Sequence, residues 1–521
     1  MGGPYARYVL VVLTLVYVFN FVDRQIISIL AEEIKADIGI SDAQIGFLYG
    51  TAFAVFYAVF GIPLGRLADV WVRKSLIAVG LAFWSAMTAL SGTARSFVSL
   101  AGFRIGVGVG EASASPAAYS LLSDSFPPRL RATALSIYSS GVYIGGGVGL
   151  FLGGWIVDAW SAAFPEGDAP FGLAGWQAAY FAVGLPGLAM ALWVWSLREP
   201  RRGQSEGLPE PPRHPNPFAA FARELASVLP PLTVFSLAFS GGGRGVLARN
   251  AIGALAIACA AWALIASVGN VPQWVALGIG AYAAFSWAQG LALRDPPAFA
   301  MIFRSPALLL TCFGFACIAF VGYGVGFWAA PFFLRAHGVS PGEVGTALGL
   351  AAAVGGWIGV TLGGILSDRL RSRTPNARLV IGGLTIVLTA PMTVWLLTEG
   401  DLRVAYVVNF FLNVAAATWL GSAATAVNEL VLPRMRAVAS AFYLLTVTFV
   451  GLALGPYAIG ALSDSMVASG RPPDAALRQA MLAALGMFAV AGVSLLLASR
   501  HLPREEATRV ERARAAGEPI L

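Results

Sequence analysis

The sequence predicts an all-α integral membrane protein: two six-helix bundles with an extra two-helix hairpin between them, about 14 transmembrane helices in all. Of the 521 residues, 57% are hydrophobic and 12% are charged, which is too little polar surface for a soluble globule. The apolar residues come in windows of about 20, long enough for a helix to cross about 30 Å of hydrocarbon. An internal duplication supports the division into two bundles.

Each bundle is expected to contain six helices bounded by charged residues and turns. In the first bundle they are expected at 8–30, 42–64, 75–93, 96–122, 132–157 and 176–197. In the second they are expected at 306–334, 341–366, 377–397, 402–430, 437–462 and 477–499. The hairpin is expected at 249–268 and 272–293, joined by an uncharged turn.

These helices define the expected domains. They are an N-terminal bundle at 1–198, a cytoplasmic linker plus the inserted hairpin at 199–304, a C-terminal bundle at 305–500 and a cytoplasmic tail at 501–521. Residues 199–217 are rich in proline and polar residues and are expected to be solvated. Val228–Ser240 is too short to span comfortably and is expected either at the membrane interface or packed on the bundle. The tail is expected to be a solvated, frayed end.

Basic residues gather in alternate loops, which are therefore predicted to face the cytoplasm. They are Arg66, Arg73, Lys74, Arg129, Arg131, Arg198, Arg201 and Arg202 in the first bundle and Arg369, Arg371, Arg373, Arg378, Arg434 and Arg436 in the second. Both termini are then expected in the cytoplasm, and the protein in a bacterial inner (plasma) membrane. The first apolar segment is too long for a cleavable signal peptide and contains polar residues, so it is expected to be retained.

The sequence argues against several function classes. A formal charge of +7 does not indicate nucleic-acid binding, because the basic residues sit in short loops without interleaved aromatic residues. Cys259, Cys312 and Cys317 lie in apolar runs and are expected to be buried hydrophobes rather than disulfides or metal ligands. Nucleotide-binding, zinc-protease and serine-hydrolase motifs are absent, so no enzyme activity, metal or cofactor is expected. The protein is expected to be a monomer.

The two bundles carry copies of one pattern. Ser41–Asp69 aligns without gaps on Ser340–Asp368, which pairs Gly46 with Gly345 and Gly65 with Gly364. Farther on, Pro128-Arg129-Leu130-Arg131-Ala132 matches Pro433-Arg434-Met435-Arg436-Ala437, and Asp158 matches Asp464. Parallel six-helix repeats of this kind place a substrate cavity where the two repeats meet, near the membrane midplane.

A polar stretch, Asn20-Phe21-Val22-Asp23-Arg24, lies deep in the first apolar helix. A charged side chain at bilayer depth costs roughly 2.5–3.5 kcal/mol on insertion scales, so these residues need partners, water or a task. From the 1.5 Å rise per residue, Asp23 and Arg104 of the fourth helix are expected at one level. Glu111 follows Arg104 by two helical turns on nearly the same face, about 10 Å closer to the cytoplasm.

The sequence therefore predicts that four charged residues couple proton binding to conformational change. They are Asp23, Arg24, Arg104 and Glu111. Asp23 and Glu111 would exchange protons while the two arginines pair with them alternately. The alternative is a static buried ion pair that fixes helix packing. For Arg104, binding a substrate headgroup is a further alternative, because guanidinium binds phosphate bidentately. Gly106, Gly108 and Gly110 are expected to allow close helix approach.

One loop resembles the signature loop between the second and third helices of the major facilitator superfamily of transporters; it is Gly65-Arg66-Leu67-Ala68-Asp69-Val70-Trp71-Val72-Arg73-Lys74. A similar, shorter stretch occurs in the second bundle at Gly364-Ile365-Leu366-Ser367-Asp368-Arg369. The resemblance implies the major facilitator fold. In such a loop a carboxylate can pair with arginines of neighbouring helices and form a latch that breaks when the bundles rock. The predicted gating residues are Gly65, Asp69, Arg73, Asp368 and Arg369. The alternative is a basic loop that serves only topology.

Within that superfamily, three stretches look like the spinster family of lipid transporters. They are Asn20 to Arg24, Arg104-Ile105-Gly106-Val107-Gly108-Val109-Gly110-Glu111-Ala112 and Ser123-Asp124-Ser125-Phe126-Pro127-Pro128-Arg129. The resemblance covers both bundles but not the hairpin. Anion-cation symporters of organic acids share a similar start to the first helix and a Glu-Ala in the fourth.

The resulting prediction is a proton-coupled secondary active transporter of amphiphilic lipids, of the lysophospholipid or sphingolipid type, working by rocker-switch alternating access. Its expected partners are an amphiphilic lipid or drug-like substrate, protons and the bilayer. The alternatives are a drug/proton antiporter, an organic-acid/proton symporter and, in a different class, a non-transporting lipid sensor. The residues predicted to line the substrate cavity are Asn20, Tyr323, Trp328, Asn409 and Asn413. Their alternative role is interhelical hydrogen bonding and core packing.

Overall fold

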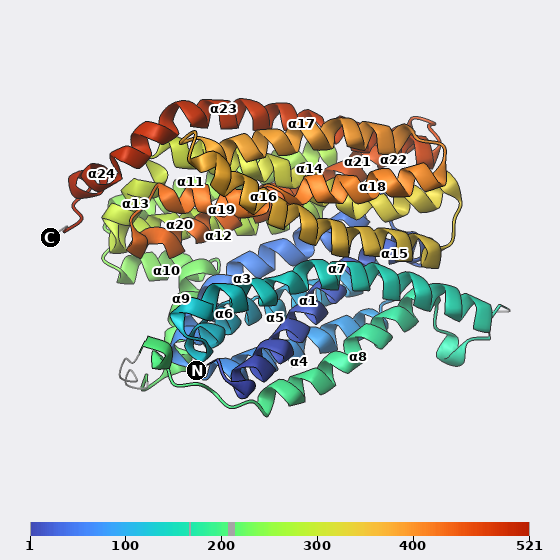
Figure 1. The fold of residues 1–521 in the computed structure, drawn as a ribbon, viewed down its shortest axis with the longest axis horizontal. Coiled ribbons are helices and arrows are strands. Elements are labelled where there is room, and N and C mark those ends of the chain that lie inside the picture. The colour runs from blue at the N-terminus through green and yellow to red at the C-terminus, as the bar shows by residue number, and fades with distance from the viewer. Residues whose placement is uncertain (1, 166–167, 207–213, 520–521) are drawn as a thin grey trace. The chain divides into compact units, whose positions relative to one another are not determined.

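The computed structural model describes residues 2–165, 168–206 and 214–519, and over this range it contains helices and no strands (Figure 1). The first repeat contains the six expected helices. They are α1 (Pro4–Ile38), α2 (Asp42–Tyr49) with α3 (Thr51–Val70), α4 (Arg73–Ser91), α5 (Phe97–Glu111) with α6 (Ala114–Ser125), α7 (Pro128–Ala163) and α8 (Gly175–Trp195). The second helix is interrupted at Gly50, and the fourth immediately after Glu111. Short 3-10 turns, η1 (Pro170–Gly172) and η2 (Gln204–Glu206), flank α8.

The second repeat has the same order of helices. They are α14 (Pro306–His337), α15 (Pro341–Leu350) with η3 (Ala351–Gly355) and α16 (Gly356–Arg371), α17 (Ala377–Thr398), α18 (Leu402–Ala417) with α19 (Leu420–Glu429), η4 (Pro433–Met435) with α20 (Arg436–Thr446), η5 (Val447–Ala453) and α21 (Leu454–Ala468), and α22 (Pro473–Ala484) with α23 (Gly486–Ala507). The segments η3 and η5 are π-helical. Both lie inside long helices, where a π turn shifts the face that the helix presents.

Between the repeats lie α9 (Pro217–Val228), α10 (Leu232–Phe239), α11 (Arg244–Val268), α12 (Val271–Arg294) and α13 (Pro296–Phe303). In the described range, 13 helices are long and apolar enough to cross a membrane. The expected number is about 14. The difference is the fourth helix of the first repeat, because neither α5 nor α6 alone is long enough to span. The segment Val228–Ser240 forms α10, which meets α9 at a bend of 108°.

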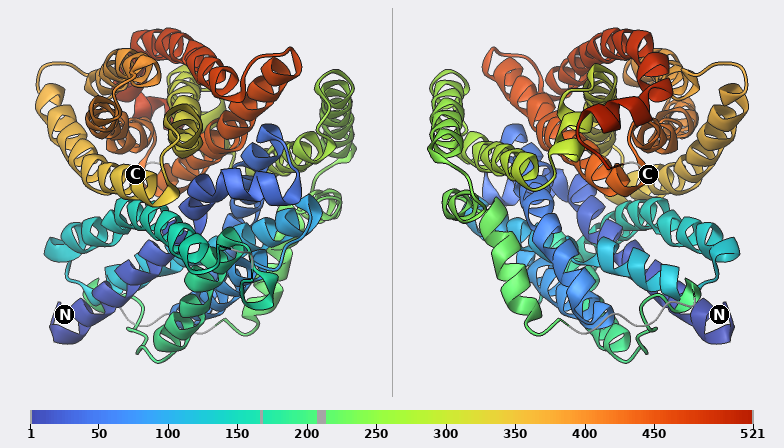
Figure 2. Two further views of the ribbon diagram at one scale, coloured as in Figure 1. Left: turned by 90° about the vertical axis from the view of Figure 1, so that its right-hand side faces the viewer. Right: turned by 90° about the vertical axis from the view of Figure 1, so that its left-hand side faces the viewer.

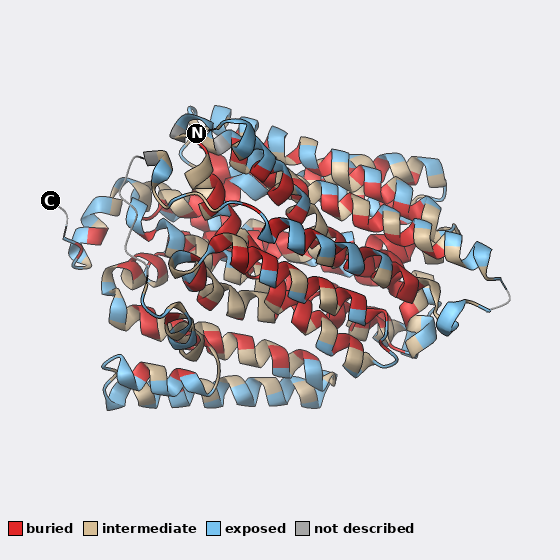
Figure 3. Ribbon diagram, turned by 90° about the horizontal axis from the view of Figure 1, so that it is seen from below, coloured by how far each residue is buried: buried red, intermediate tan, exposed pale blue. Residues whose placement is uncertain are grey.

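The chain forms two compact units that do not follow the repeats throughout. Unit 1 comprises Met1–Ile40, Phe56–Leu225 and Gly338–Val354, and unit 2 comprises Ser41–Val55, Ala226–His337 and Gly355–Leu521. The first half of the second helix of each repeat is thus exchanged: α2 packs in unit 2 and α15 in unit 1. Buried residues lie on one side of most helices and exposed residues on the other (Figure 3).

The exchanged helices make the same contact twice. In unit 2, a Cβ on Gly46 of α2 would lie 2.6 Å from the carbonyl oxygen of Pro456 in α21. In unit 1, a Cβ on Gly345 of α15 would lie 2.3 Å from the carbonyl oxygen of Leu150 in α7. Real Cβ atoms do not come this close to backbone, so glycine is required at both positions. The glycine pair seen in the duplicated sequence therefore marks two equivalent helix crossings.

At each of these crossings an aspartate caps the N-terminus of the exchanged helix, α2 or α15. In unit 2, Asp464 accepts hydrogen bonds from the backbone N–H groups of Asp42 (3.0 Å) and Ala43 (2.8 Å), the first residues of α2. In unit 1, Asp158 accepts from the backbone N–H of Gly342 (2.9 Å) and the Ser340 hydroxyl (2.6 Å) at the start of α15. A carboxylate satisfies N–H groups that the helix leaves unpaired and is favoured there by the helix dipole. The repeated Asp158 and Asp464 are thus caps supplied by a different helix.

The inserted hairpin packs α11 along α12 (Figure 2) and is held by a closed polar network. The amide of Asn250 donates to Ser286 (3.0 Å) and Gln289 (2.8 Å) and accepts from the Tyr282 hydroxyl (2.7 Å). Thr233 of α10 donates to that hydroxyl at 3.1 Å. These bonds satisfy the buried Asn250 side chain. The other face of α11 is open, and Cys259 is exposed there rather than buried as expected.

The C-terminal tail is not the solvated, frayed end that the sequence suggests. It continues α23 to Ala507 and forms α24 (Arg509–Ala515), and both helices are tied to the basic loops of unit 2. Glu505 accepts hydrogen bonds from the Ser305 hydroxyl and from the backbone N–H of Ala307 (3.0 Å), while Glu506 pairs with Arg371. Beyond α24, Glu518 is 9% exposed and pairs with Arg434. The mixed charges of the tail meet complementary partners on the helix ends.

We expect alanine at Gly46 or Gly345 to lower the thermal unfolding midpoint in detergent. The added methyl group overlaps a backbone carbonyl that cannot move alone, and overpacking of this kind costs about 1–3 kcal/mol. Gly383→Ala is the matched control, because no atom lies within 4 Å of the added Cβ. In a helix this change should stabilise by about 0.5–1 kcal/mol. Equal midpoints for the three variants would contradict the close crossing.

The attachment of the tail should depend on pH. Hydrogen bonds from Arg434 hold the pKa values of Asp295 and Glu518 below their ordinary values. Their contribution to tail attachment is therefore complete above about pH 4 and is lost as pH falls through the lowered values. The protection of amides in 509–518, taken relative to the intrinsic exchange rate at each pH, should fall at low pH, and Glu518→Gln should produce the same loss of protection at neutral pH. Glu511→Gln, at an exposed position, should change nothing.

Candidate functional site

The charged stretch of α1 makes its main contact with the end of α5. Nη2 of Arg24 lies 2.7 Å from Oε2 of Glu111, and the same nitrogen donates to Oδ1 of Asn20 at 3.3 Å. The Glu111 side chain is 0% exposed and that of Arg24 is 13% exposed, all within unit 1. The direction of Arg24, which the sequence leaves open, is therefore toward Glu111. A buried charge pair of this kind is strong only while both members stay ionised and hydrogen-bonded.

Arg104 lies beside Asp23 but does not pair with its carboxylate. Nη1 of Arg104 donates to the backbone carbonyl of Asp23 at 3.0 Å, so the two residues share a level, as the helical rise suggests. Both side chains are fully buried. Neither carboxylate oxygen of Asp23 has a hydrogen-bond partner among the described residues. The site thus holds one carboxylate in an ion pair and a second without a direct partner.

Aromatic rings surround the guanidinium of Arg24. Its Cζ lies 4.5 Å from the ring centre of Phe21 and 5.4 Å from that of Tyr57. Tyr17, one turn before Phe21, stacks on Tyr138 of α7 with ring centres 4.4 Å apart. A cation over an aromatic face is attracted by the ring quadrupole, and the attraction grows when water is excluded. These rings hold Arg24 in the orientation that reaches Glu111.

Glycines place α5 close enough to α4 to bury the charged residues. A Cβ on Gly110 would lie 2.8 Å from Cβ of Trp84, and one on Gly106 would lie 2.7 Å from the sulfur of Met87. The expected packing role of these glycines is what the structure shows. These contacts fix α5, and with it Arg104 and Glu111, against α4.

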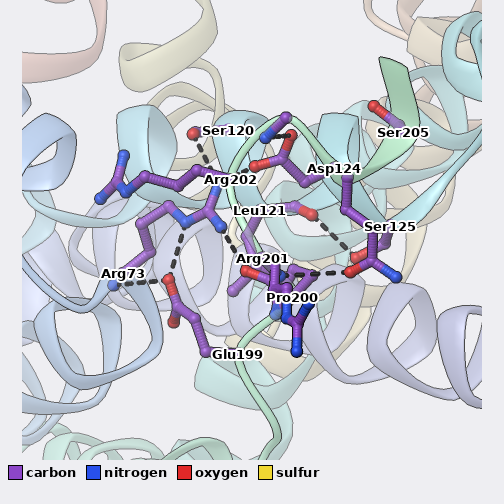
Figure 4. Close-up of polar contacts among 12 residues, drawn as sticks. Arg73, Ser120, Leu121, Asp124, Ser125, Glu199, Pro200, Arg201, Arg202 and Ser205 are labelled. Atoms are coloured by element: carbon purple, nitrogen blue, oxygen red, sulfur yellow. Dashed lines mark hydrogen bonds and ion pairs between the residues drawn. The ribbon is translucent and has the colours of Figure 1, made fainter. Parts of the chain in front are cut away.

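The signature loop forms a charge cluster at the arginine-rich end of unit 1 (Figure 4). Arg73 is fully buried, and its Nε and Nη1 lie 2.8 Å from Glu199 and 2.5 Å from Asp124, respectively. Its other hydrogen bonds go to the Ser120 hydroxyl and the Pro200 carbonyl, both at 2.9 Å. Arg73 thus joins the start of α4 to the end of α6 and to the chain after α8.

The first residues of the linker pack against this cluster and are not solvated as expected. Arg202 donates to the carbonyl oxygens of Ala68 and Trp71, both at 2.7 Å, and the backbone N–H of Gly203 donates to Asp124 at 3.0 Å. Residues 207–213 lie outside the described residues. Asp69 is exposed, and its electrostatic neighbours are Arg66 and Arg202. In this state Asp69 therefore interacts more weakly than Arg73 does.

In unit 2 the corresponding cluster uses a residue that the sequence prediction treats only as part of a basic loop. Arg378, at the start of α17, pairs with Asp368 at 2.7 Å and with Glu429 at 3.4 Å, and donates to Ser367 at 2.7 Å. Arg369, predicted for this role, is exposed. The available signal was position: Arg73 and Arg378 both begin the third helix of a repeat, and Asp124 and Glu429 both end the fourth. The longer loop before Arg378 hides the match.

At the opposite end of unit 2, an ion pair fixes α2 to α14. Arg335 binds Asp42 through two hydrogen bonds of 2.7 and 2.9 Å, and the Ser463 hydroxyl donates to the same carboxylate at 2.8 Å. Asp42 is 2% exposed. The aligned position in the second repeat is Pro341, so this pair has no copy in unit 1. Sequence alone does not indicate this pair, because Asp42 and Arg335 are far apart in the chain.

The predicted cavity residues have different surroundings. Trp328 is fully buried, its ring nitrogen donates to the Pro456 carbonyl at 2.8 Å, and its role in this structure is packing. Asn409 is 4% exposed, and its backbone carbonyl oxygen accepts a hydrogen bond of 2.9 Å from the side-chain amide of Asn413. Asn413 and Tyr323 are partly exposed. Contact of these residues and of Asn20 with a substrate stays a prediction.

Residues 13–456 match the family model of the Major Facilitator Superfamily. The chain belongs to the major facilitator superfamily. The match runs from α1 through the first repeat and the hairpin to the start of α21 in the second repeat, and it includes the signature loop and the buried charges of α1 and α5. The protein is thus a membrane transporter of this superfamily and not an enzyme.

Among curated proteins the transporter is similar to an MFS-type efflux pump of Mycolicibacterium smegmatis, with 28% identity over 95% of this chain and 92% of that protein. It is also similar to human protein spinster homolog 1, with 27% identity over 88% of this chain and 74% of that protein. Among solved structures it resembles an inward-facing bacterial homologue of the human lysosomal transporter spinster. That match has a TM-score of 0.73 and 28% identity over 97% of this chain and 99% of the other.

We expect Arg73→Gln to destabilise unit 1 much more than Lys74→Gln does. The first change leaves the partly buried carboxylates of Asp124 and Glu199 without their cation, and removing one member of a buried ion pair costs about 3–5 kcal/mol. Lys74 instead donates to one exposed carbonyl, that of Trp195. Thermal unfolding in detergent measures the difference. Equal loss in both variants would show that the cluster contributes no more than a surface contact.

Proposed function

We propose that the protein is a proton-coupled secondary active transporter of amphiphilic lipids of the lysophospholipid or sphingolipid class, working by rocker-switch alternating access. The observation that carries the proposal is the buried ion pair of Arg24 and Glu111 beside a second buried carboxylate, Asp23. Its setting is a bacterial inner membrane with both termini in the cytoplasm, the orientation that the basic loops predict.

The ion pair supplies a physical link between proton binding and conformation. Protonation of Glu111 removes the charge that holds Arg24, which leaves a buried guanidinium in need of another acceptor. Asp23, one residue away on the same helix, is the nearest second carboxylate. A change of partner by Arg24 or by Arg104 then accompanies movement of α1 against α5, so that proton uptake and helix movement occur together.

The two equivalent crossings support the rocker-switch part of the proposal. For access to alternate, α2 must separate from α21 and α15 from α7, and the caps at Asp464 and Asp158 must open with them. Rigid packing at glycines favours two discrete arrangements over a continuous deformation. The charge clusters at Arg73 and Arg378 are formed together with these crossings and join helices at the arginine-rich end of each unit.

The choice of an amphiphilic substrate rests on two observations. The chain resembles spinster proteins over most of its length. In addition, the four residues predicted to couple protons, Asp23, Arg24, Arg104 and Glu111, are charged, whereas three candidate cavity residues of the second repeat are neutral, namely Asn409, Asn413 and Tyr323. A charged region and a neutral one suit a molecule with a polar head and an apolar chain.

A second candidate is efflux of drug-like amphiphiles in exchange for protons. The relative from Mycolicibacterium smegmatis is named an efflux pump and matches nearly the whole chain. An apolar cation is stabilised by the same kind of aromatic and carboxylate surroundings that Arg24 has here. The two candidates share the proton-coupling site and differ only in substrate.

The test is flux in proteoliposomes under an imposed pH gradient, with labelled lysophospholipid and with a lipophilic cationic dye in separate arms. We expect wild-type lysophospholipid flux to follow the gradient. Glu111→Gln and Asp23→Asn should reduce it to the gradient-independent rate, because each removes a group that can release a proton.

Asp168→Asn is the matched control, since Asp168 is an exposed acid on a loop and should leave flux unchanged. Gradient-driven movement of the dye alone would favour the efflux function over lipid transport. Wild-type flux of both compounds that ignores the gradient would exclude proton coupling.

A further inference from the structure

Four side chains of unit 1 form a buried polar group that the ion pair does not include. We call Asp23, Trp84, Thr88 and Tyr180 the Asp23 cluster; each is 0% exposed. Both carboxylate oxygens of Asp23, the ring N–H of Trp84 and the hydroxyls of Thr88 and Tyr180 have no hydrogen-bond partner among the described residues. Buried polar atoms are nearly always paired, so several unpaired atoms in one place require an explanation.

The cluster is brought together from three helices. Trp84 and Thr88 lie one turn apart on α4, and both face the carboxylate of Asp23 on α1 without completing a direct hydrogen bond to it. Tyr180 of α8 is an electrostatic neighbour of Asp23 and of Arg104. The helices α4 and α8 are in close contact along this face, where a Cβ on Gly187 would lie 2.1 Å from the Ser85 hydroxyl oxygen.

The chemistry of these groups fits water. The ring N–H of Trp84 can only donate, the two hydroxyls can donate and accept, and the carboxylate accepts or, once protonated, also donates. A water molecule needs two to four such partners in a polar site, and it bridges groups that face one another beyond direct reach. A metal cation fits less well, because the guanidinium of Arg104 lies against Asp23 and donates to its backbone carbonyl.

We propose that Trp84, Thr88 and Tyr180 hold internal water molecules against the Asp23 carboxylate and that these waters carry the proton to and from Asp23. The proposal rests on the proposed function, in which Asp23 changes protonation state. It adds positioning residues, on α4 and α8, to the charged residues of α1 and α5.

The proton step is simple in this arrangement. A water of the cluster gives one proton to a carboxylate oxygen of Asp23 and regains one from the next water, so charge moves without movement of the side chain. The charged or titratable groups that face Asp23 are Glu111 and Arg104 on α5 and Tyr180 on α8, while α4 contributes the neutral donors. Glu111 remains engaged by Arg24 during the step.

The experiment is infrared difference spectroscopy of the full-length protein in lipid nanodiscs during a pH change. The carboxylic C=O band of Asp23 is assigned by its loss in Asp23→Asn. We expect this band to move at once on transfer to D2O, although Asp23 is fully buried. Thr88→Val should shift the band to higher wavenumber, because the water that donates to the Asp23 carbonyl loses one of its partners, and slow its exchange by about tenfold. Tyr180→Phe should slow exchange as well.

Thr393→Val is the matched control, because Thr393 is a buried threonine of α17 whose hydroxyl already donates to the Thr389 carbonyl at 2.8 Å. Thr88→Ser, which keeps the hydroxyl, should restore the wild-type band and covers the case in which the valine variant does not fold. Unchanged exchange in both Thr88→Val and Tyr180→Phe would overturn the proposal. Absence of any Asp23 carboxyl band, together with stabilisation of the protein by Na⁺, would overturn it in favour of a cation.

This readout is independent of transport. If the band behaves as expected while lipid flux ignores the pH gradient, the water cluster stands and the proposed proton coupling fails. If flux follows the gradient but the band does not depend on Thr88 or Tyr180, coupling stands and the water cluster fails.

Discussion

The ion pair of Arg24 and Glu111 is the interaction on which the rest of unit 1 depends. Two charges buried in an apolar bundle are tolerated only with close contact, and this requirement determines how α1, α4 and α5 pack. The glycines of α5 allow the approach, and the rings of Phe21 and Tyr57 hold the guanidinium in place. Removing the charge on Glu111 would leave Arg24 as a buried cation without its carboxylate partner.

The arrangement of the helices was predictable from the sequence because it follows from hydropathy and duplication. The pairing of Gly46 with Gly345 was also visible in the sequence, because both copies have glycine at a position where a side chain would overlap a neighbouring backbone. The level shared by Asp23 and Arg104 followed from the rise of a helix. These properties depend on spacing along one helix, which a sequence shows directly.

The choice of partners was not predictable in the same way. Whether Arg24 or Arg104 reaches Glu111 depends on the rotation of α1 against α5, which is decided by packing on the other faces of both helices. Arg378 escaped notice because the loop before it is longer than its counterpart before Arg73. The tail and the linker looked solvated, since their partners, such as Arg434 for Glu518 and Arg73 for Glu199, lie far away in the chain.

The polar network of the hairpin has a consequence for biosynthesis. Asn250 lies inside an apolar helix, where an unsatisfied amide would oppose entry into the bilayer. All of its hydrogen bonds go to α12, and the connected Thr233 belongs to α10, so the network closes within residues 233–289. The hairpin can therefore enter the bilayer as a self-contained pair while the second repeat is still being made. It then offers α12 as a preformed surface on which the helices synthesised after it can assemble.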